Sequence, residues 1–271
     1  MMSENFSSSS YAALAPIYER IGYADFAREA VPRYIARAQL LDWAGRRILD
    51  LGCGTGASTW LLAERGYRVV GVEANPHMLA VARAYVQAQA EAAATEQHVI
   101  EPPDLVQMDI RALESPIGTV DLVLAAGGVL NAILSLRELE QTFAHVNAAL
   151  EAGQLFVFDV HTIYGLAHAY GTRDEVVYDA EDLTVIVRHR FSYEALSLTS
   201  RYVIYRRENG TWTRSEDALF LRGYPVQGVR ALLERTGFAV VEVLDLAMQP
   251  LDLQAEPPAE RAIFVAQKQG E

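Results

Sequence analysis

The chain is poor in cysteine and in basic residues. Its only cysteine is Cys53, so no disulfide can form within the chain and no cysteine-based metal site is possible. Lysine and arginine total 23 against 35 aspartates and glutamates, which gives a formal net charge of −12. Because phosphate binding depends on clustered basic residues, this balance argues against a nucleic acid or an anionic membrane as partner.

The sequence also lacks targeting and membrane signals. No apolar run approaches the roughly 18 residues of a transmembrane helix. The opening stretch, MMSENFSSSS, contains neither the basic region nor the apolar region of a signal peptide. The histidines, at positions 77, 98, 145, 161, 168 and 189, form no convincing pairing with carboxylates. We therefore expect a soluble cytoplasmic protein with no metal and no membrane partner.

Short apolar runs alternate with helix-like segments over most of the 271 residues, of which 51% are hydrophobic and 21% charged. Such alternation predicts a parallel sheet with helices on both faces. We expect strands over residues 47–51, 67–72, 105–108, 120–125, 154–160, 239–246 and 262–266. We expect helices over residues 57–65, 76–94, 136–150 and 226–235.

Two segments depart from this alternation. Residues 11–41 carry aromatic and apolar side chains at helical spacing, which predicts two helices with a break near Gly22. Runs rich in Val, Ile, Tyr and Thr, which are typical of strands, occupy residues 183–193, 197–207 and 211–222. Asn209 and Gly210 tolerate positive φ and predict a tight hairpin between the last two runs. We therefore expect an antiparallel insertion after the fifth strand.

The most informative stretch is ILDLGCGTG, residues 48–56. Its glycines, Gly52, Gly54 and Gly56, follow a strand and precede a helix, so the backbone there can approach a ligand closely. Their G-x-G-x-G spacing differs from the G-x-G-x-x-G of dinucleotide-binding proteins, and the absence of Gly-Lys-Ser/Thr excludes a Walker-type phosphate loop. Glu73 stands 21 positions after Gly52 at a strand end, where an acid can accept hydrogen bonds from ribose hydroxyls.

With these features the sequence resembles the class I S-adenosylmethionine-dependent methyltransferases. The matching stretches, in the expected order, are LDLGCGTG (49–56), GVEANPHML (71–79), QMDI (107–110) and VDLVLAAGGVLN (120–131). The resemblance implies an α/β, Rossmann-like fold with a seven-stranded, mostly parallel sheet and helices on both faces. It implies an N-terminal helical lid over residues 1–45 and a methyltransferase domain over residues 46–271, with the antiparallel insertion at about 165–224. S-adenosylmethionine is the implied cofactor.

The resemblance also implies roles for individual residues. The three glycines would line the methionine end of the cofactor, and Glu73 would bind both ribose hydroxyls. Asp109 would accept a hydrogen bond from the adenine amino group, and the Ile110 amide would face a ring nitrogen. The remaining implied contacts are Ala74 and Met78 beside the adenosine, Ala125 beside the methionine moiety, and Tyr18 closing over the cofactor.

Three residues near the implied cofactor site can also be interpreted as core or packing residues. Tyr18 resembles a tyrosine that closes over the cofactor, but aromatic residues at helical spacing are equally typical of a core. Tyr11 is open to the same two interpretations. Cys53 is interpreted as a small packing residue, because no base is identifiable near it.

The methyl acceptor is expected beyond the carboxyl ends of the strands. His161 ends the fifth strand near the expected methyl group, where a histidine can act as a base or orient the acceptor. A hydrogen-bonded loop histidine is the alternative. Strand alternation places His189 on the face opposite to its arginine neighbours. Weaker candidates for the acceptor site are Tyr164, Asn131, Glu216 and Arg222.

The insertion followed by GYPVQGVRALLERTGF (223–238) is similar to a bacterial small-molecule subgroup that includes methyltransferases acting on amino groups of nucleotide-linked sugars. The chain departs from that subgroup at Leu219, where members often have a histidine, and at the bare pair Gly127-Gly128. We expect methyl transfer to a nitrogen or oxygen of a small-molecule acceptor, with no nucleic acid as partner, mainly through positioning and desolvation. The alternatives are a nicotinamide-dependent oxidoreductase, a cofactor-binding protein without turnover, and a protein or tRNA methyltransferase.

Overall fold

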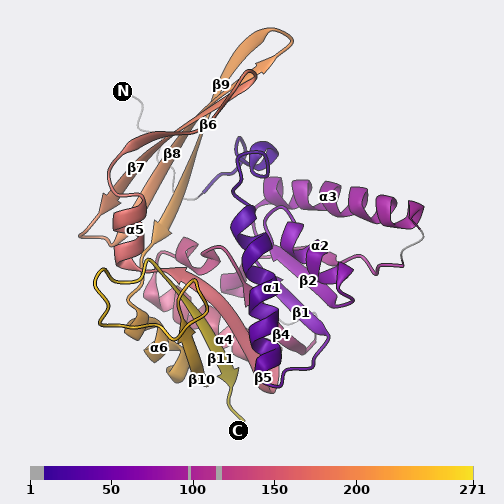
Figure 1. Ribbon diagram of the computed structural model, residues 1–271, viewed down its shortest axis with the longest axis vertical. Coiled ribbons are helices and arrows are strands. Elements are labelled where there is room, and N and C mark those ends of the chain that lie inside the picture. The colour runs from indigo at the N-terminus through magenta and orange to yellow at the C-terminus, as the bar shows by residue number, and fades with distance from the viewer. Residues whose placement is uncertain (1–8, 97–98, 114–117, 271) are drawn as a thin grey trace.

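A mostly parallel sheet forms the centre of the molecule (Figure 1). The structure is a computed structural model that describes residues 9–96, 99–113 and 118–270, and within them this sheet has seven strands in the order β10-β11-β5-β4-β1-β2-β3. Pairing is parallel except at β11, which runs antiparallel to both β5 and β10. The strands are β1 (Arg47–Leu51), β2 (Arg68–Glu73), β3 (Asp104–Gln107), β4 (Val120–Ala125), β5 (Leu150–His161), β10 (Phe238–Leu244) and β11 (Arg261–Lys268). The predicted Rossmann-like fold is confirmed.

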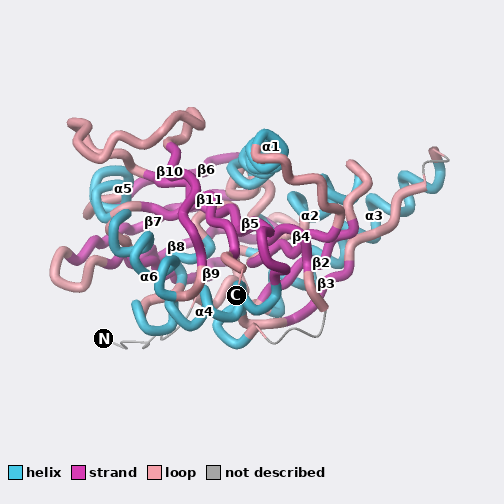
Figure 2. The backbone as a smooth tube through the Cα atoms, turned by 90° about the horizontal axis from the view of Figure 1, so that it is seen from below, coloured by secondary structure: helices cyan, strands magenta, loops and turns pink. Residues whose placement is uncertain are grey.

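Helices cover both faces of the sheet (Figure 2). One face packs against α1 (Asp25–Leu40) and α2 (Ala57–Glu64), and the other against α4 (Leu136–Ala149) and α6 (Val226–Arg235). The helix α3 (Pro76–Thr95) lies against β2 and β3. Neighbouring strand residues face opposite sides of the sheet, so Ile48 packs on the face covered by α1 and α2, and Leu49 packs on the face covered by α4 and α6. Burial on both faces explains why the central strands are continuous apolar runs.

A second, antiparallel sheet lies beyond the carboxyl end of β5 and follows α5 (Ile163–Ala169). Among the described residues it has four strands in the order β6-β7-β8-β9, so the predicted insertion is confirmed. The sequence patterns did not predict α5 or β6. The turn between β8 and β9 has φ of 50° at Asn209 and 80° at Gly210, as the hairpin prediction requires. The strands are β6 (Asp174–Ala180), β7 (Leu183–Ser192), β8 (Ser197–Glu208) and β9 (Thr211–Arg222).

The predicted helix before Gly22 is wrong. Within that segment only η1 (Ala15–Ile17) forms, as a single 3-10 turn, whereas the second predicted helix is present as α1. The backbone N–H groups of Ala13 and Leu14 donate to Asp217 Oδ2 on β9, at 2.9 and 3.1 Å. A contact with a distant strand therefore holds this segment against the second sheet. Residues 1–8, which include most of the opening stretch and the start of the predicted lid, lie outside the described residues.

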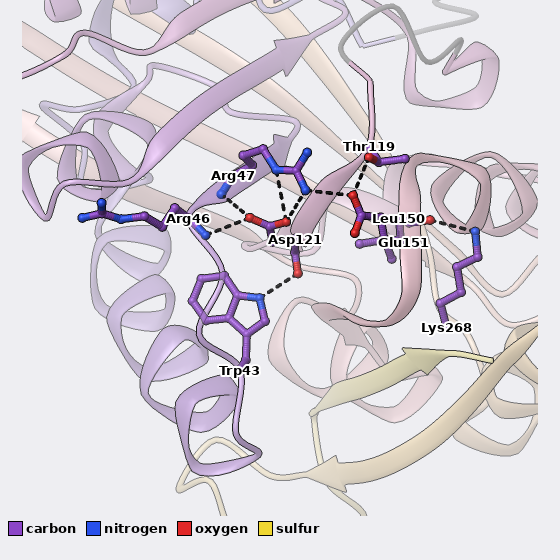
Figure 3. Close-up of polar contacts among 8 residues, drawn as sticks. All are labelled: Trp43, Arg46, Arg47, Thr119, Asp121, Leu150, Glu151 and Lys268. Carbon is purple, nitrogen blue, oxygen red and sulfur yellow. Dashed lines mark hydrogen bonds and ion pairs between the residues drawn. The ribbon is translucent and has the colours of Figure 1, made fainter. Parts of the chain in front are cut away.

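The amino edge of the central sheet is closed by a polar cluster (Figure 3). The Asp121 carboxylate at the start of β4 accepts the backbone N–H groups of Arg46 and Arg47, both at 2.9 Å. The Trp43 indole donates to the Asp121 carbonyl oxygen at 2.7 Å, and the Arg47 guanidinium also reaches Glu151 at 2.9 Å. These contacts tie the α1–β1 connection to β4 and β5. The carboxyl edge is the one left for a ligand, as in other open α/β sheets.

Candidate active site

The glycine-rich turn between β1 and α2 lies at the carboxyl edge of the sheet. Gly52, Gly54 and Gly56 have φ values of 62°, 58° and 79°, in the left-handed region that favours glycine. A Cβ on Gly52 would lie 2.6 Å from Val129 Cγ1, and one on Gly56 would lie 3.2 Å from Ala82 Cβ. The turn therefore needs glycine both for its backbone angles and for the close approach of η3 (Val129–Ala132) and α3.

Gly52→Ala is expected to destabilise the protein more than Gly66→Ala, its matched control. Both positions have positive φ, so both alanines meet backbone strain of about 1–2 kcal/mol. A Cβ at Gly66 would have nothing within 4 Å, whereas one at Gly52 would collide with Val129. We expect overpacking to cost Gly52→Ala about 1–3 kcal/mol more in unfolding free energy, measured by denaturant titration. Equal losses in the two variants would contradict the close packing of this turn.

Glu73, the last residue of β2, lies over the glycine-rich turn. Its carboxylate accepts the backbone N–H of Gly54 at 3.1 Å and that of Asn75 at 2.8 Å. Burial raises the pKa of this carboxyl, although the backbone N–H groups that it accepts oppose the increase. The sheet thus holds a carboxylate at the strand end where the sequence predicted one.

The other predicted cofactor residues lie at the ends of neighbouring strands. Ala125 ends β4 and is fully buried. Asp109 follows β3, and its carboxylate accepts the backbone N–H of Arg111 at 2.9 Å and the Arg111 guanidinium at 2.6 Å. These Arg111 hydrogen bonds hold the pKa of Asp109 below its usual range, so it is a ready acceptor. Ile110, half-buried, begins the 3-10 turn η2 (Ile110–Ala112) directly after it.

The first turn of α3 closes one side of the glycine-rich turn. Asn75 caps this helix by accepting the backbone N–H groups of His77 and Met78 at 2.9 and 3.2 Å. The buried Met78 side chain reaches Gly54, whose Cβ would lie 3.5 Å from Met78 Cε. Ala74 is exposed beside them. The predicted roles of Ala74 and Met78 beside an adenosine stay predictions.

Residues 9–23, here called the N-terminal cover, cross the carboxyl edge from the second sheet to α3 (Figure 1). At one end the backbone N–H of Phe220 on β9 donates to Ser9 Oγ at 3.3 Å. At the next residue, Asn75 Nδ2 at the start of α3 donates to the Ser10 carbonyl oxygen at 2.7 Å. The Thr55 hydroxyl of the glycine-rich turn donates to Glu19 of the cover. The cover therefore lies directly over the turn.

Three tyrosines of the N-terminal cover form a continuous ring series. The Tyr11 and Tyr18 ring centroids are 6.3 Å apart, those of Tyr18 and Tyr23 are 5.5 Å apart, and Tyr23 lies 6.0 Å from Tyr202 on β8. Burial raises the pKa of both Tyr11 and Tyr18, and the Glu73 carboxylate raises both further. Tyr18 and Tyr11 are half-buried at the place where the sequence predicted a residue closing over the cofactor.

His161, at the end of β5, is buried and held on three sides. Its backbone N–H donates to Asn131 Oδ1 at 2.8 Å, and its Nε2 lies 2.5 Å from Arg261 Nη2. A Cβ on Gly128 would lie 3.0 Å from the imidazole, which accounts for glycine at that position, whereas Gly127 has open space around it and a positive φ of 96°. Burial, and then the Arg261 charge, lower the His161 pKa to about 3. The ring is therefore neutral at physiological pH, with Nε2 accepting from Arg261.

A buried ion pair beside His161 was missed in the sequence. The Arg261 guanidinium pairs with Asp159, which is fully buried and also accepts from the Tyr34 hydroxyl at 3.0 Å and from the Gly127 N–H at 2.7 Å. An aspartate inside the apolar run FVFDVH was the available signal for the acid. Its partner lies 102 positions away along the chain, so no local pattern could reveal it.

The weaker sequence candidates separate into different surroundings. Asn131 has a structural role. Its amide holds two segments together by donating to the carbonyl oxygens of His161 and Arg222, at 3.0 and 2.6 Å. Tyr164 stacks on His168 with ring centroids 5.0 Å apart. Glu216 is exposed and pairs with Arg214 on the outer face of β9, away from the cover.

Three further side chains that the sequence singled out are His189, Arg222 and Cys53, and each has a defined structural environment. His189 lies on the buried face of β7, opposite its exposed arginine neighbours, as alternation predicted. Arg222 donates to the Leu134 carbonyl oxygen at 2.7 Å. Cys53 is buried, and burial raises its pKa well above the usual range, so it is a packing residue rather than a nucleophile.

The described residues contain neither a group that could bind a metal ion nor a helix that could span a membrane. In residues 9–96, 99–113 and 118–270, no three His, Cys, Asp or Glu side chains are grouped so that they could hold a metal ion. Within the same part of the chain, no helix combines the length and apolarity that crossing a bilayer requires.

Comparison with known proteins agrees with this geometry. Residues 48–153 match a family model described as a methyltransferase domain. A Geobacillus sp. (strain WCH70) protein named as a methyltransferase is 29% identical over 232 residues, which is 82% of this chain and 85% of that protein.

Solved structures show the same fold over nearly the whole chain. An S-adenosylmethionine-dependent methyltransferase from Clostridium acetobutylicum has a TM-score of 0.77 at 20% identity, covering 96% of this chain and 99% of that one. A sugar N-methyltransferase from Streptoalloteichus sp. has a TM-score of 0.72 at 19% identity, covering 100% of this chain and 97% of that one. Residues 48–153 are thus similar to a methyltransferase domain, and the whole chain has the fold of proteins named as S-adenosylmethionine-dependent methyltransferases.

Proposed function

We propose that this methyltransferase transfers the methyl group of S-adenosylmethionine to a nitrogen or oxygen of a small-molecule acceptor. The observation that carries the proposal is the N-terminal cover, which joins β9 to the start of α3 across the carboxyl edge. A site covered in this way suits a small acceptor rather than a protein or a tRNA, because closure excludes water from the reacting groups. The fold similarity to a sugar N-methyltransferase supports the same substrate class.

The residues at this edge fit the cofactor. Glu73 supplies a carboxylate for the ribose hydroxyls, and the glycine-rich turn offers backbone without Cβ atoms to the methionine end. Asp109 and the Ile110 amide offer an acceptor and a donor to the adenine, while Tyr18 covers the cofactor from the N-terminal side. When bound, S-adenosylmethionine supplies a methyl group activated by a sulfonium. The chain then contributes orientation, which can supply about 7–11 kcal/mol of the barrier.

We propose that His161 orients the acceptor and does not take its proton. Its Nε2 already accepts from Arg261, and a pKa of about 3 makes the ring a poor base. His161→Gln is therefore expected to lower kcat by about 10- to 100-fold through lost positioning. The profile of kcat/KM from pH 5 to 9 should keep its shape. A limb near pH 6.5 that disappears in His161→Gln would contradict this assignment.

The proposed function is tested by a screen with S-adenosylmethionine carrying a tritiated methyl group. Amines, hydroxy acids, phenols and sugar nucleotides are offered in parallel with purified tRNA and total protein. We expect label in one of the small-molecule pools, on nitrogen or oxygen. Label confined to the tRNA or protein pool would overturn the small-molecule assignment, and no label in any pool would favour the alternative of a cofactor-binding protein without turnover.

A further inference from the structure

The inner face of the second sheet carries a polar band within an apolar surface. Most side chains on this face, such as Val185 and Ile204, pack against apolar residues of the N-terminal cover. Strand alternation places four buried polar residues on the same face, and these are His189, Ser200, Tyr202 and Asp217. The band faces the ring series of the cover, because Tyr202 contacts Tyr23.

Most polar atoms of this band are matched within the protein. His189 Nδ1 lies 2.9 Å from Ser200 Oγ, and His189 Nε2 lies 3.1 Å from Glu175 Oε1. Asp217 is different. It is 1% exposed, and only its Oδ2 is used, by the backbone N–H groups of Ala13 and Leu14.

Asp217 Oδ1 is buried and has no hydrogen-bond partner among the described residues. A buried carboxylate oxygen without a donor is costly, and such atoms in folded proteins are commonly matched by a ligand or an ordered water. The two N–H groups on Oδ2 fix the carboxylate, so Oδ1 is held in one orientation.

The surroundings of Asp217 connect it to the cofactor site. Tyr202 lies opposite Asp217 in the β8–β9 register. Burial raises the pKa of the Tyr11 phenol, and Tyr18, Glu73 and Asp217 raise it further. The residues beside Tyr11 connect the two carboxylates by hydrogen bonds. Ala13 and Leu14 donate to Asp217, and the Ser10 carbonyl oxygen accepts from Asn75, whose backbone N–H donates to Glu73. Aromatic rings around a carboxylate are a favourable setting for a positively charged nitrogen.

We propose that Asp217 Oδ1 is the acceptor subsite for an amino group, which makes the small-molecule substrate an amine. This inference rests on the proposed function and selects nitrogen over oxygen as the methylated atom. The amine loses its proton to solvent before transfer, and it then donates an N–H to Oδ1 while its lone pair stays free.

The charge movement of the reaction favours a carboxylate at this place. Transfer forms the N–CH3 bond as the S–CH3 bond breaks, and the electron pair of the broken bond stays on sulfur. The positive charge therefore leaves sulfur and develops on nitrogen. A fixed carboxylate beside that nitrogen stabilises the transition state more than the neutral reactant amine, which is the condition for a rate gain.

The test compares isopropylamine with isopropanol, two fragment probes that differ in the donor group. Binding to protein loaded with S-adenosylhomocysteine is measured by ligand-observed NMR at pH 9, and tritium transfer from S-adenosylmethionine is measured in parallel. We expect wild-type protein to prefer isopropylamine by about 10-fold, the value of one charge-assisted hydrogen bond, and D217N to lose that preference. The asparagine oxygen can still accept the Ala13 and Leu14 N–H groups, so D217N should keep its affinity for S-adenosylmethionine within about twofold, which calorimetry checks.

E216Q is the matched control, because Glu216 is exposed on the outer face of the same strand. It should behave as the wild type for both probes. Equal binding of the two probes by wild-type protein, or an unchanged preference in D217N, would overturn the subsite. If D217N does not fold, the preference of wild-type protein for isopropylamine over isopropanol is by itself the test of the subsite. Label that appears only on hydroxyl acceptors would overturn the subsite and leave the proposed function standing, whereas label on no small molecule would overturn the proposed function.

Discussion

Glu73→Ala is expected to weaken S-adenosylmethionine binding by about 100-fold or more. The carboxylate is assigned to both ribose hydroxyls, and each hydrogen bond to a charged group is worth about 1.5–3 kcal/mol. It lies at the end of β2 over the glycine-rich turn, and no other carboxylate was assigned to the ribose. Isothermal titration calorimetry with S-adenosylmethionine and with its demethylated product measures the loss.

Two companion variants make the Glu73 result specific. Glu73→Gln keeps one acceptor oxygen, enough for only one of the N–H groups of Gly54 and Asn75, and it removes the charge, so we expect an intermediate affinity. Glu64→Ala removes an exposed carboxylate on α2 and should bind as the wild type does. A Glu73→Ala variant that binds as tightly as the wild type would show that the ribose assignment is wrong.

Arg261→Leu is expected to lower the unfolding free energy by about 3–5 kcal/mol, because it leaves a buried charge without its partner. Asp159 is fully buried, and the Arg261 side chain is only 12% exposed. Tyr34 and Gly127 continue to donate to Asp159 Oδ1, but neither carries a positive charge. Denaturant titration at pH 7 measures the loss.

The double variant Asp159→Asn, Arg261→Leu separates the lost charge pair from lost packing. Removing the carboxylate as well should recover most of the stability, since the uncompensated charge is then gone. A loss below about 1 kcal/mol in the single variant would contradict the buried ion pair as a determinant of stability, since that is the range of an exposed pair.

Arg261 also sets part of the pH dependence of stability. The folded protein holds the His161 pKa at about 3, below the ordinary value of 6.5, so the unfolded chain binds a proton that the folded protein does not. The His161 contribution to stability is therefore complete above about pH 6.5 and is lost as the pH falls toward 3. Arg261→Leu removes one of the two causes of the shift, so this loss should span a narrower pH range in the variant.

The central sheet was largely predictable because its signals are local. Buried apolar runs that end at glycines gave β1, β4 and the turn at Gly52 without any long-range information. The Asn209-Gly210 hairpin is likewise a property of two adjacent residues. Glu73 could be assigned because a strand end and a fixed spacing from the glycines place it.

The parts that were not predicted depend on contacts between distant residues. The segment of the first predicted helix is held against the second sheet by Asp217, which accepts the N–H groups of Ala13 and Leu14 from more than 200 positions away. The surroundings of His161 are set by Arg261, 100 positions later, which turns a candidate base into a neutral hydrogen-bond acceptor. Helical spacing and strand alternation describe which face a residue takes, and carry no information on such partners.

Methyl transfer to a small molecule is tested most directly by offering purified wild-type protein S-adenosylmethionine with a tritiated methyl group. We expect label to move from S-adenosylmethionine to a small amine, and Glu73→Ala to lower the transfer sharply at cofactor concentrations that just saturate the wild type. Label recovered only in tRNA or protein, with small molecules unlabelled, would contradict this expectation.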